Sequence, residues 1–344
     1  MDLPVLSFNY PRRWGVEMEV NSLDQRDFKT HPLIKSELPQ GIEKMATMIT
    51  EFLGEKTVVK GWHPTHNNDC WVLKPDSSCG IEICSPVQKG WLGLNATCKV
   101  ADLIKSTKIP VDNRCSLHVH VDVDDCNRST VAKILSYWIK CESVFLDSVP
   151  LHRKRNRYCQ CIGMSDLFDH DSPLDDATIL AKLGQQKYYT INCFHFYRSE
   201  RNTIEARIAE SDGCVDSLLL KNWVRLILHF VEMAIKAPAI ENYNPNNPHS
   251  GFCWLDLEDV ISFLGFSGEY QLSPGMEQVR NWFLARLNQN ISKSGKCLPG
   301  VWSDTARKIS KQQLDNIIDR LNLTDLDSYL NWSEAAVYSD NYKN

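Results

Sequence analysis

Apolar and polar residues alternate in several short segments of the first two-thirds of the chain. An alternation with period two places apolar side chains on one side of a strand and polar side chains on the other, so it predicts half-buried strands. Between two of these segments, Asp-Ser-Ser-Cys is typical of a tight turn and predicts a hairpin. The predicted strands are Trp14–Val20, Trp71–Pro75, Gly80–Cys84, Ser116–Val123, Tyr189–Phe196 and Thr203–Ala209.

Apolar residues at spacings of three and four predict helices along the whole chain. The strongest amphipathic pattern, Val215–Ala237, stops just before Pro238, and Ser303 is a candidate N-cap for the last helix. The predicted helices are Gly41–Leu53, Leu92–Ile104, Ser129–Val149, Val215–Ala237, Leu255–Phe263, Met276–Ile291 and Asp304–Leu321.

The pattern divides the chain into a mixed part and a helical part. Pro150–Lys187 is predicted to be rich in loops, and Asn242–Gly251 is rich in Asn and Pro, which indicates a linker or an exposed turn. After this segment only helices are predicted. We therefore expect an α+β catalytic domain at 1–240 and a helical C-terminal extension at 241–344.

Composition and charge narrow the class of protein. The chain has 344 residues, with 38 basic and 43 acidic side chains and a formal net charge of −5, which argues against general nucleic-acid binding. No run of about 18 apolar residues predicts a membrane helix, and Met1–Trp14 lacks the apolar core of a signal peptide. The 13 cysteines include no CxxC, so we expect reduced, buried thiols, no structural zinc and a cytoplasmic protein.

Charged side chains and histidines occupy the polar side of the predicted strands. Glu17 and Glu19 share one side of a strand, His118, His120 and Asp122 share a side of another, and Glu205 and Arg207 share a third. Glu82 lies on the hairpin, with Lys74 and Asp76 on the strand and turn before it. Each pair alone is equally compatible with an exposed polar face.

Taken together, these residues predict a site for hard cations. A curved antiparallel sheet carrying carboxylates and histidines on one face would bind Mg²⁺, and magnesium ions with Arg and Lys serve phosphoryl transfer from a nucleotide. The sequence contains neither GxxxxGK[ST] nor GxGxxG, so a nucleotide would not use a P-loop or a Rossmann turn.

The order of five motifs resembles the amidoligase family, within the glutamine synthetase/glutamate–cysteine ligase superfamily of ATP-dependent carboxylate–amine ligases. The resemblance covers about Arg13–Pro238. The motifs are Gly15-Val-Glu-Met-Glu19, Trp71-Val-Leu-Lys-Pro-Asp76, Gly80-Ile-Glu-Ile-Cys-Ser-Pro86, Cys115-Ser-Leu-His-Val-His120 and Thr203-Ile-Glu-Ala-Arg207.

This resemblance implies a sheet of the glutamine synthetase catalytic type with helices on its outer face. It implies an ADP-forming ligase that joins a carboxylate to an amine through an acyl phosphate, using ATP and two or three Mg²⁺ ions, which Mn²⁺ could replace. The acid could be a small molecule or a peptide, and the amine could be ammonia from a glutaminase partner. The resemblance also allows a homo-oligomer.

The resemblance implies a role for each residue of this chain that matches a position of the family's motifs. Glu205, Arg207 and His118 would be catalytic, with Arg207, Lys74 and His120 at the nucleotide phosphates. Asp76 and the loop residues Arg153, Arg157 and Tyr158 would bind substrate, although a solvated basic run explains the loop equally well. Ser116-Leu117 stands where the family has a glycine before the histidine. The implied metal ligands are Glu17, Glu19, Glu82, His118 and Glu205.

Three other functions fit the same residues. A metal-dependent hydrolase could use His118 and His120 with Glu17 or Glu205 and would hold zinc or iron. A catalytically inactive binding module could keep the fold. A cysteine nucleophile, Cys115 or Cys84 beside His118, lacks any feature that would activate the thiol.

Overall fold

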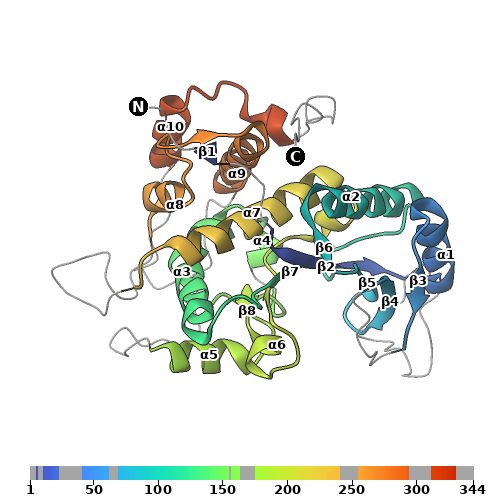
Figure 1. Ribbon diagram of the computed structural model, residues 1–344. Coiled ribbons are helices and arrows are strands. Elements are labelled where there is room, and N and C mark those ends of the chain that lie inside the picture. Colours follow the sequence, from blue (N-terminus) through green and yellow to red (C-terminus); the bar gives the residue numbers. More distant parts are fainter. Residues whose placement is uncertain are drawn as a thin grey trace. The chain divides into compact units, whose positions relative to one another are not determined.

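The computed structural model describes residues 5–6, 11–22, 41–61, 69–154, 156–162, 175–240, 255–293 and 311–330. The chain folds into two compact units, each assembled from separate segments (Figure 1). The first comprises 1–10, 123–202 and 225–344, and the second comprises 11–122 and 203–224. The boundary predicted after residue 240 does not coincide with this division and stays a prediction.

A mostly antiparallel sheet forms the centre of the second unit. Its strands lie in the order β3-β4-β5-β2-β7-β9, and β6 also pairs with β2. Only the β3–β4 pairing among these strands is parallel. The strands are β2 (Arg13–Asn21), β3 (Thr57–Val59), β4 (Trp71–Asp76), β5 (Gly80–Cys84), β6 (Gln88–Lys89), β7 (Leu117–Asp122) and β9 (Thr203–Ala206).

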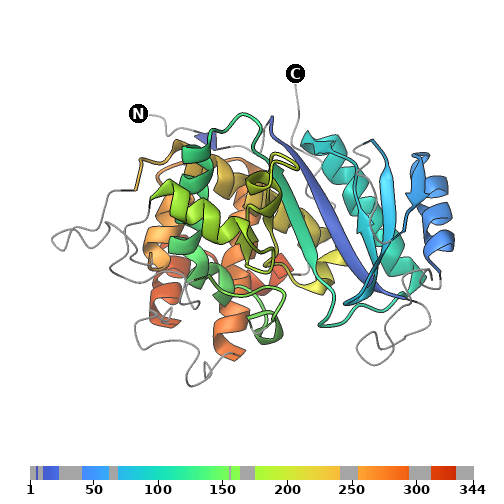
Figure 2. The ribbon, with the colours of Figure 1, turned by 90° about the horizontal axis from the view of Figure 1, so that it is seen from below.

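Helices α1 (Ile42–Leu53) and α2 (Gly90–Thr107) lie along one side of this sheet (Figures 1 and 2). The apolar side chains of the strands, among them Met18, Ile83 and Val119, are buried. The helices present their own buried apolar residues, and the period-two alternation of the strands therefore leaves the polar side chains on the opposite face. The 3-10 helix η1 (Ser211–Cys214) and the start of α7 (Ser217–Lys236) complete the unit.

The first unit is mainly helical. Trp138 and Phe145 of α3 stack with ring centroids 4.8 Å apart, and Phe230 of α7 meets Trp138 edge-on at 5.2 Å. Asn127 begins α3 by accepting a hydrogen bond from the Thr130 amide (2.8 Å). The helices of this unit are α3 (Arg128–Asp147), α4 (Leu151–Lys154), α5 (Asp176–Gly184), α6 (Phe194–Tyr197), the rest of α7, α8 (Leu257–Phe263), α9 (Pro274–Lys293), α10 (Lys311–Arg320) and η2 (Leu326–Leu330).

Most of the predicted elements are present, and three local predictions are wrong. The strand predicted at Tyr189–Phe196 is only β8 (Ile191–Asn192), because the Asn192 side chain accepts from the Phe194 amide (3.1 Å) in a local turn just before α6. The region predicted as loop contains α5, whose N-cap is Asp175. The C-terminal third is not wholly helical, since β10 (Gln271–Leu272) pairs in parallel with β1 (Val5–Leu6). The predicted linker Asn242–Gly251 and Ser303 lie outside the described residues.

Within the described residues, no helix combines the length and the hydropathy needed to cross a membrane.

Candidate active site on the polar face of the sheet

Strand register brings the predicted site residues together on one face of the sheet. Residues directly opposite one another on paired strands have neighbouring side chains on the same side. Around the central strand β2, Glu17 lies opposite both Cys84 and His118, and Glu19 lies opposite Glu82. The remaining opposed pairs on this face are Lys74 with Glu82 and His120 with Glu205. We call this set, with Arg207, the polar face.

Most of the polar face is buried, and Glu17, Lys74 and Cys84 are half-buried. Glu19, Glu82, His118 and Glu205 are between 1% and 7% exposed, and Arg207 is 6% exposed. The interpretation of each pair as an exposed polar surface is therefore wrong. Burying this many ionisable groups costs free energy unless they neutralise one another or hold a cation.

His118 is at the centre of the contacts. Its Nε2 lies 2.7 Å from Ser116 Oγ, and its Nδ1 lies 3.2 Å from Glu17 Oε2. Burial, followed by the Arg207 guanidinium, lowers the pKa of His118 to about 4, although Glu17 and Glu205 act in the opposite direction. The imidazole is therefore neutral at pH 7, which is the form that binds metals.

Glu205 and Arg207 form a close ion pair, with Nη1 2.6 Å from Oε1. Burial alone would raise the pKa of Glu205, but Arg207, His120 and His118 outweigh it and lower the pKa to about 2. Burial likewise acts to lower the pKa of Arg207, and the Glu205 carboxylate raises it above its usual value. Glu205 on β9 and Arg207 just after it thus hold one fixed negative and one fixed positive charge.

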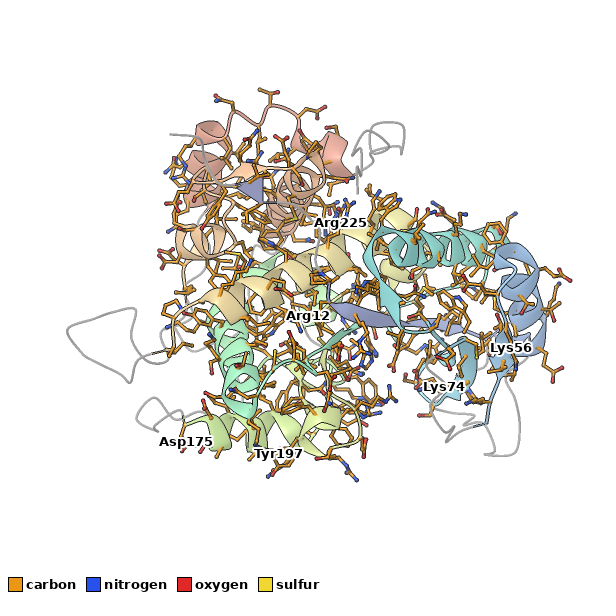
Figure 3. All side chains as sticks on the ribbon, in the orientation of Figure 1. Arg12, Lys56, Lys74, Asp175, Tyr197 and Arg225 are labelled. Atoms are coloured by element: carbon orange, nitrogen blue, oxygen red, sulfur yellow. The ribbon has the colours of Figure 1, made fainter. Side chains whose placement is uncertain are left out.

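Lys74 of β4, labelled in Figure 3, places a second positive charge beside these carboxylates. Lys74 Nζ lies 2.7 Å from Glu82 Oε1. Burial and the Glu17 charge raise the pKa of Glu82 to about 7 despite this contact. Burial alone would raise the pKa of Glu17, but the charges of His120 and Lys74 lower it well below its usual value.

The charges of the polar face fit a divalent cation. Burial and the Asp76 charge raise the pKa of Glu19 to about 8, so Glu19 is largely protonated at pH 7 and Glu82 is partly so. Four glutamates thus face two permanent cations, and protons supply the missing positive charge. A divalent ion could replace those protons, and carboxylate oxygens are the ligands that Mg²⁺ prefers.

Among the described residues, three groups of side chains offer ligand atoms within 4.8 Å of one another. One of them, formed by Glu17, His120 and Glu205, draws on three strands. The other two each include a thiol. The groups are Glu17 with His120 and Glu205, Glu17 with Glu82 and Cys84, and Glu19 with Asp76 and Cys79.

The predicted set of ligands and catalytic residues omits two side chains that contact the site. Ser116 Oγ donates to Glu19 Oε2 (2.6 Å) as well as contacting His118, and Cys84 Sγ donates to Glu82 Oε1 (3.2 Å). The period-two spacing of Ser116 from His118 and of Cys84 from Glu82 was the available signal. Burial raises the pKa of Cys84 well above its usual value, which argues against a cysteine nucleophile.

Asp122, which belongs to the same unit, is not brought into this cluster. Asp122 pairs with Arg13 instead, with Arg13 Nε 2.7 Å from Asp122 Oδ2. Arg153, Arg157 and Tyr158 belong to the other compact unit, where Arg157 donates to the Tyr158 hydroxyl (2.6 Å). Their predicted role in binding substrate stays a prediction.

Comparisons with known proteins give one match to a family. Among solved structures, a bifunctional glutathione synthetase from Pasteurella multocida matches with a TM-score of 0.38 and 10% sequence identity. That match covers 94% of this chain and 48% of the other, so the chain spans about half the length of that structure. No curated protein matches the sequence. The model of a family described as "putative amidoligase enzyme" matches residues 37–231. Because this match spans more than half of the chain, the protein belongs to the amidoligase family, whose name denotes enzymes that form amide bonds.

Proposed function

We propose that the protein is an ATP- and Mg²⁺-dependent ligase that joins a carboxylate to an amine on the polar face. One observation carries the proposal: the register of β2, β5, β7 and β9 gathers four glutamates, two histidines and Arg207 on one face, where all but Glu17 are buried. Family membership supports amide formation. The mostly antiparallel sheet, with helices along one side, supports a catalytic fold of the glutamine synthetase type.

Carboxylates of the polar face would hold the metal ions. Glu17 and Glu205, with His120, form one group of possible ligands, and Glu82 and Glu19 extend the set along the sheet. His118 presents a neutral imidazole beside them. Bound Mg²⁺ would neutralise phosphate charge and polarise the transferred phosphoryl group.

Two cationic side chains are placed to bind phosphate. Arg207 is held by Glu205 through Nη1, and a planar guanidinium is the side chain whose fork of N–H groups can bind two phosphate oxygens at once. Lys74, on the opposite side of β2, supplies a point charge. We assign Arg207 to the γ-phosphate and Lys74 to the remaining phosphates.

The reaction proceeds in two displacements. A carboxylate oxygen of the acid attacks the γ-phosphorus, the bond to the bridging oxygen of ADP breaks, and an acyl phosphate forms. The amine nitrogen then attacks the acyl carbon, inorganic phosphate leaves, and the nitrogen loses a proton. The chain stabilises the charge that develops on the phosphoryl oxygens and positions the two substrates.

Calorimetric titration with a non-hydrolysable ATP analogue tests the proposal without knowledge of the acid or the amine. We expect binding that requires Mg²⁺ in the wild type and is lost in Glu205→Gln, which removes a metal charge. Glu51→Gln, an exposed change on α1 in the same unit, is the matched control and should bind as the wild type does.

Two results would contradict this assignment. Binding that is unaffected by Glu205→Gln would remove the nucleotide from the polar face. The absence of binding at any metal concentration, together with zinc or iron bound through His118 and His120, would favour a metal-dependent hydrolase instead.

A further inference from the structure

The hydroxyl of Ser116 lies between Glu19 and His118 on the polar face. Its Oγ is 2.6 Å from Glu19 Oε2 and 2.7 Å from His118 Nε2, and the residue is 3% exposed. Both distances are those of hydrogen bonds, so each contact has a hydrogen atom between its two heavy atoms. The hydroxyl thus links two side chains that the proposed function assigns to the metal site.

The backbone of Ser116 is held by neighbouring elements of the same unit. Its carbonyl oxygen accepts hydrogen bonds from the Glu19 amide (3.1 Å) and from Cys214 Sγ (3.4 Å). Ser116 also forms an isolated antiparallel bridge with Glu210. The spacing of two residues along extended backbone places its side chain on the same side as that of His118. The sheet and its neighbours therefore fix where the hydroxyl meets the imidazole.

A serine hydroxyl has one hydrogen atom to donate, and this limits what His118 can do. Ser116 donates its hydrogen to Glu19 Oε2, so towards His118 Nε2 it can only accept. A neutral imidazole carries a hydrogen on one ring nitrogen alone, and His118 is neutral at pH 7. The hydrogen of His118 therefore lies on Nε2, and Nδ1 keeps its lone pair.

Nδ1 of His118 lies among charged groups. It is 3.2 Å from Glu17 Oε2 and 3.4 Å from Glu205 Oε1. A lone pair facing two carboxylate oxygens is repelled unless a positive charge lies there as well. Arg207 Nη1, 3.4 Å from Nδ1, supplies such a charge, and a bound metal ion would supply a larger one. Nδ1 is thus placed to bind a cation that Glu17 and Glu205 hold.

Burial of a serine alone does not indicate such a role. The buried hydroxyls of Ser136 and Ser148, for example, donate to the carbonyl oxygens of Ala132 (2.8 Å) and Phe145 (2.7 Å) within or beside their own helix. Ser116 differs because both partners of its hydroxyl are ionisable side chains of the polar face.

We propose that Ser116 is a positioning residue that keeps the hydrogen of His118 on Nε2 and so presents the Nδ1 lone pair to the metal ion of the polar face. When the second nitrogen of a ligating imidazole loses its fixed hydrogen-bond partner, metal affinity typically falls about 10- to 100-fold. The same hydroxyl orients the Glu19 carboxylate. The role in metal binding rests on the proposed function, whereas the tautomer can be measured in the metal-free protein.

Nitrogen-15 NMR of the full-length protein labelled at histidine, without metal or nucleotide, measures the tautomer. A protonated and a bare ring nitrogen have well-separated chemical shifts, and His118→Gln identifies the signals of His118 by their absence. We expect a protonated Nε2 and a bare Nδ1 in the wild type. In Ser116→Ala the hydrogen on Nε2 loses its acceptor, and we expect it to move to Nδ1, which can donate to Glu17.

Three further variants separate the hydroxyl from packing. Ser116→Thr keeps a hydroxyl and should keep the wild-type tautomer. Ser136→Ala, which removes another buried hydroxyl, should leave the signals of His118 unchanged. Ser116→Cys serves if the alanine variant does not fold, because a thiol is a weak acceptor and should also move the hydrogen to Nδ1.

Manganese titration, followed by the electron paramagnetic resonance signal of the unbound ion, measures the consequence for metal binding. Ser116→Ala should bind Mn²⁺ about tenfold more weakly than the wild type does. Ser116→Thr and Ser136→Ala should bind it as the wild type does.

A wild-type His118 with its hydrogen on Nδ1 would overturn the inference, because Ser116 would then donate to Nε2 and could not donate to Glu19. The wild-type tautomer in both Ser116→Ala and Ser116→Cys would overturn it as well. So would Mn²⁺ binding that is absent in the wild type or equally tight in Ser116→Ala. None of these measurements involves a nucleotide. The expected tautomer and Mn²⁺ affinities, found together with a failure to bind the ATP analogue, would contradict the ligase proposal alone.

Discussion

Two of the buried histidines lie in contrasting surroundings, His118 on the polar face and His229 among the helices of the other unit. His118 contacts Glu17 at 3.2 Å and Glu205 at 3.4 Å. His229 on α7 donates from Nε2 to the Leu264 carbonyl oxygen (2.7 Å) and stacks on Phe266. Burial lowers the pKa of both to about 4.

The contrast shows that neither burial nor a shifted pKa identifies a functional histidine. His229 binds a carbonyl oxygen and packs on an aromatic ring, as expected of a histidine that stabilises a helical core. His118 lies among glutamates and an arginine whose charges neutralise one another. Replacing one of these groups therefore changes the pKa values of the others. The following predictions test this difference.

The largest effect is expected for Arg207→Met. This variant leaves the Glu205 carboxylate buried without its cation, which should lower the free energy of unfolding by about 3–5 kcal/mol. Urea denaturation measures the loss. The double variant Arg207→Met/Glu205→Gln should recover most of the lost stability, because it also removes the Glu205 carboxylate charge that has no cation beside it.

Arg320→Met is the matched control for this experiment. Arg320 forms an exposed pair with Glu258 (2.9 Å), and its loss should cost less than about 1 kcal/mol. Equal losses in Arg207→Met and Arg320→Met would contradict the view that the polar face depends on internal charge balance.

Arg207→Lys should preserve the charge and still weaken nucleotide binding. The ammonium group is a compact point charge without the planar fork that binds two phosphate oxygens side by side, and losing one hydrogen bond between charged groups costs about 2 kcal/mol. Calorimetry with the ATP analogue and Mg²⁺ should therefore show affinity reduced roughly 30-fold. Affinity equal to that of the wild type would remove Arg207 from the phosphate.

Titration of His229 should make the free energy of unfolding depend on pH, and the variant His229→Gln should lack this contribution. Its pKa is about 4 in the folded protein and about 6.5 when unfolded. The unfolded chain therefore binds more protons, and the stabilisation present above pH 6.5 is lost as the pH falls towards 4. The contribution to the decrease between pH 7 and 5 is about 2 kcal/mol.

Urea denaturation of His229→Gln at both pH values measures this contribution. Glutamine can donate to the Leu264 carbonyl oxygen and does not titrate, so the decrease should be smaller by that amount. The same decrease in the variant and the wild type would show that His229 does not titrate as inferred.

The smallest effect is expected for Arg13→Ala. Arg13 is about half exposed, and its pairing with Asp122 lies apart from the polar cluster. Solvent screening limits such a pair to about 0.5 kcal/mol. Both the melting temperature and binding of the ATP analogue should stay close to the wild type, and a marked loss of binding would assign Asp122 to the site.

Sequence periodicity predicted the strands of the polar face well, because Glu17, His118 and Glu205 each alternate with buried apolar residues. It did not predict their burial, which depends on tertiary packing of both faces. It also missed α6, where an Asn192 side chain overrides the propensity of the following residues for a strand. The meeting of Glu17 with His118 and of His120 with Glu205 depends on strand order, which local patterns do not encode.

The central position of β2 has a consequence for how the protein is made. Glu17 on β2 meets His118 from 101 residues later, and Arg207 follows His118 by a further 89 residues. During synthesis the first carboxylates therefore leave the ribosome long before the arginine that balances them. Pairings this distant along the chain form slowly, so a nascent chain that ends before β9 should hold an unfinished, hydrated sheet. The polar face would then be completed only when β9, the last strand of the second unit, has left the ribosome.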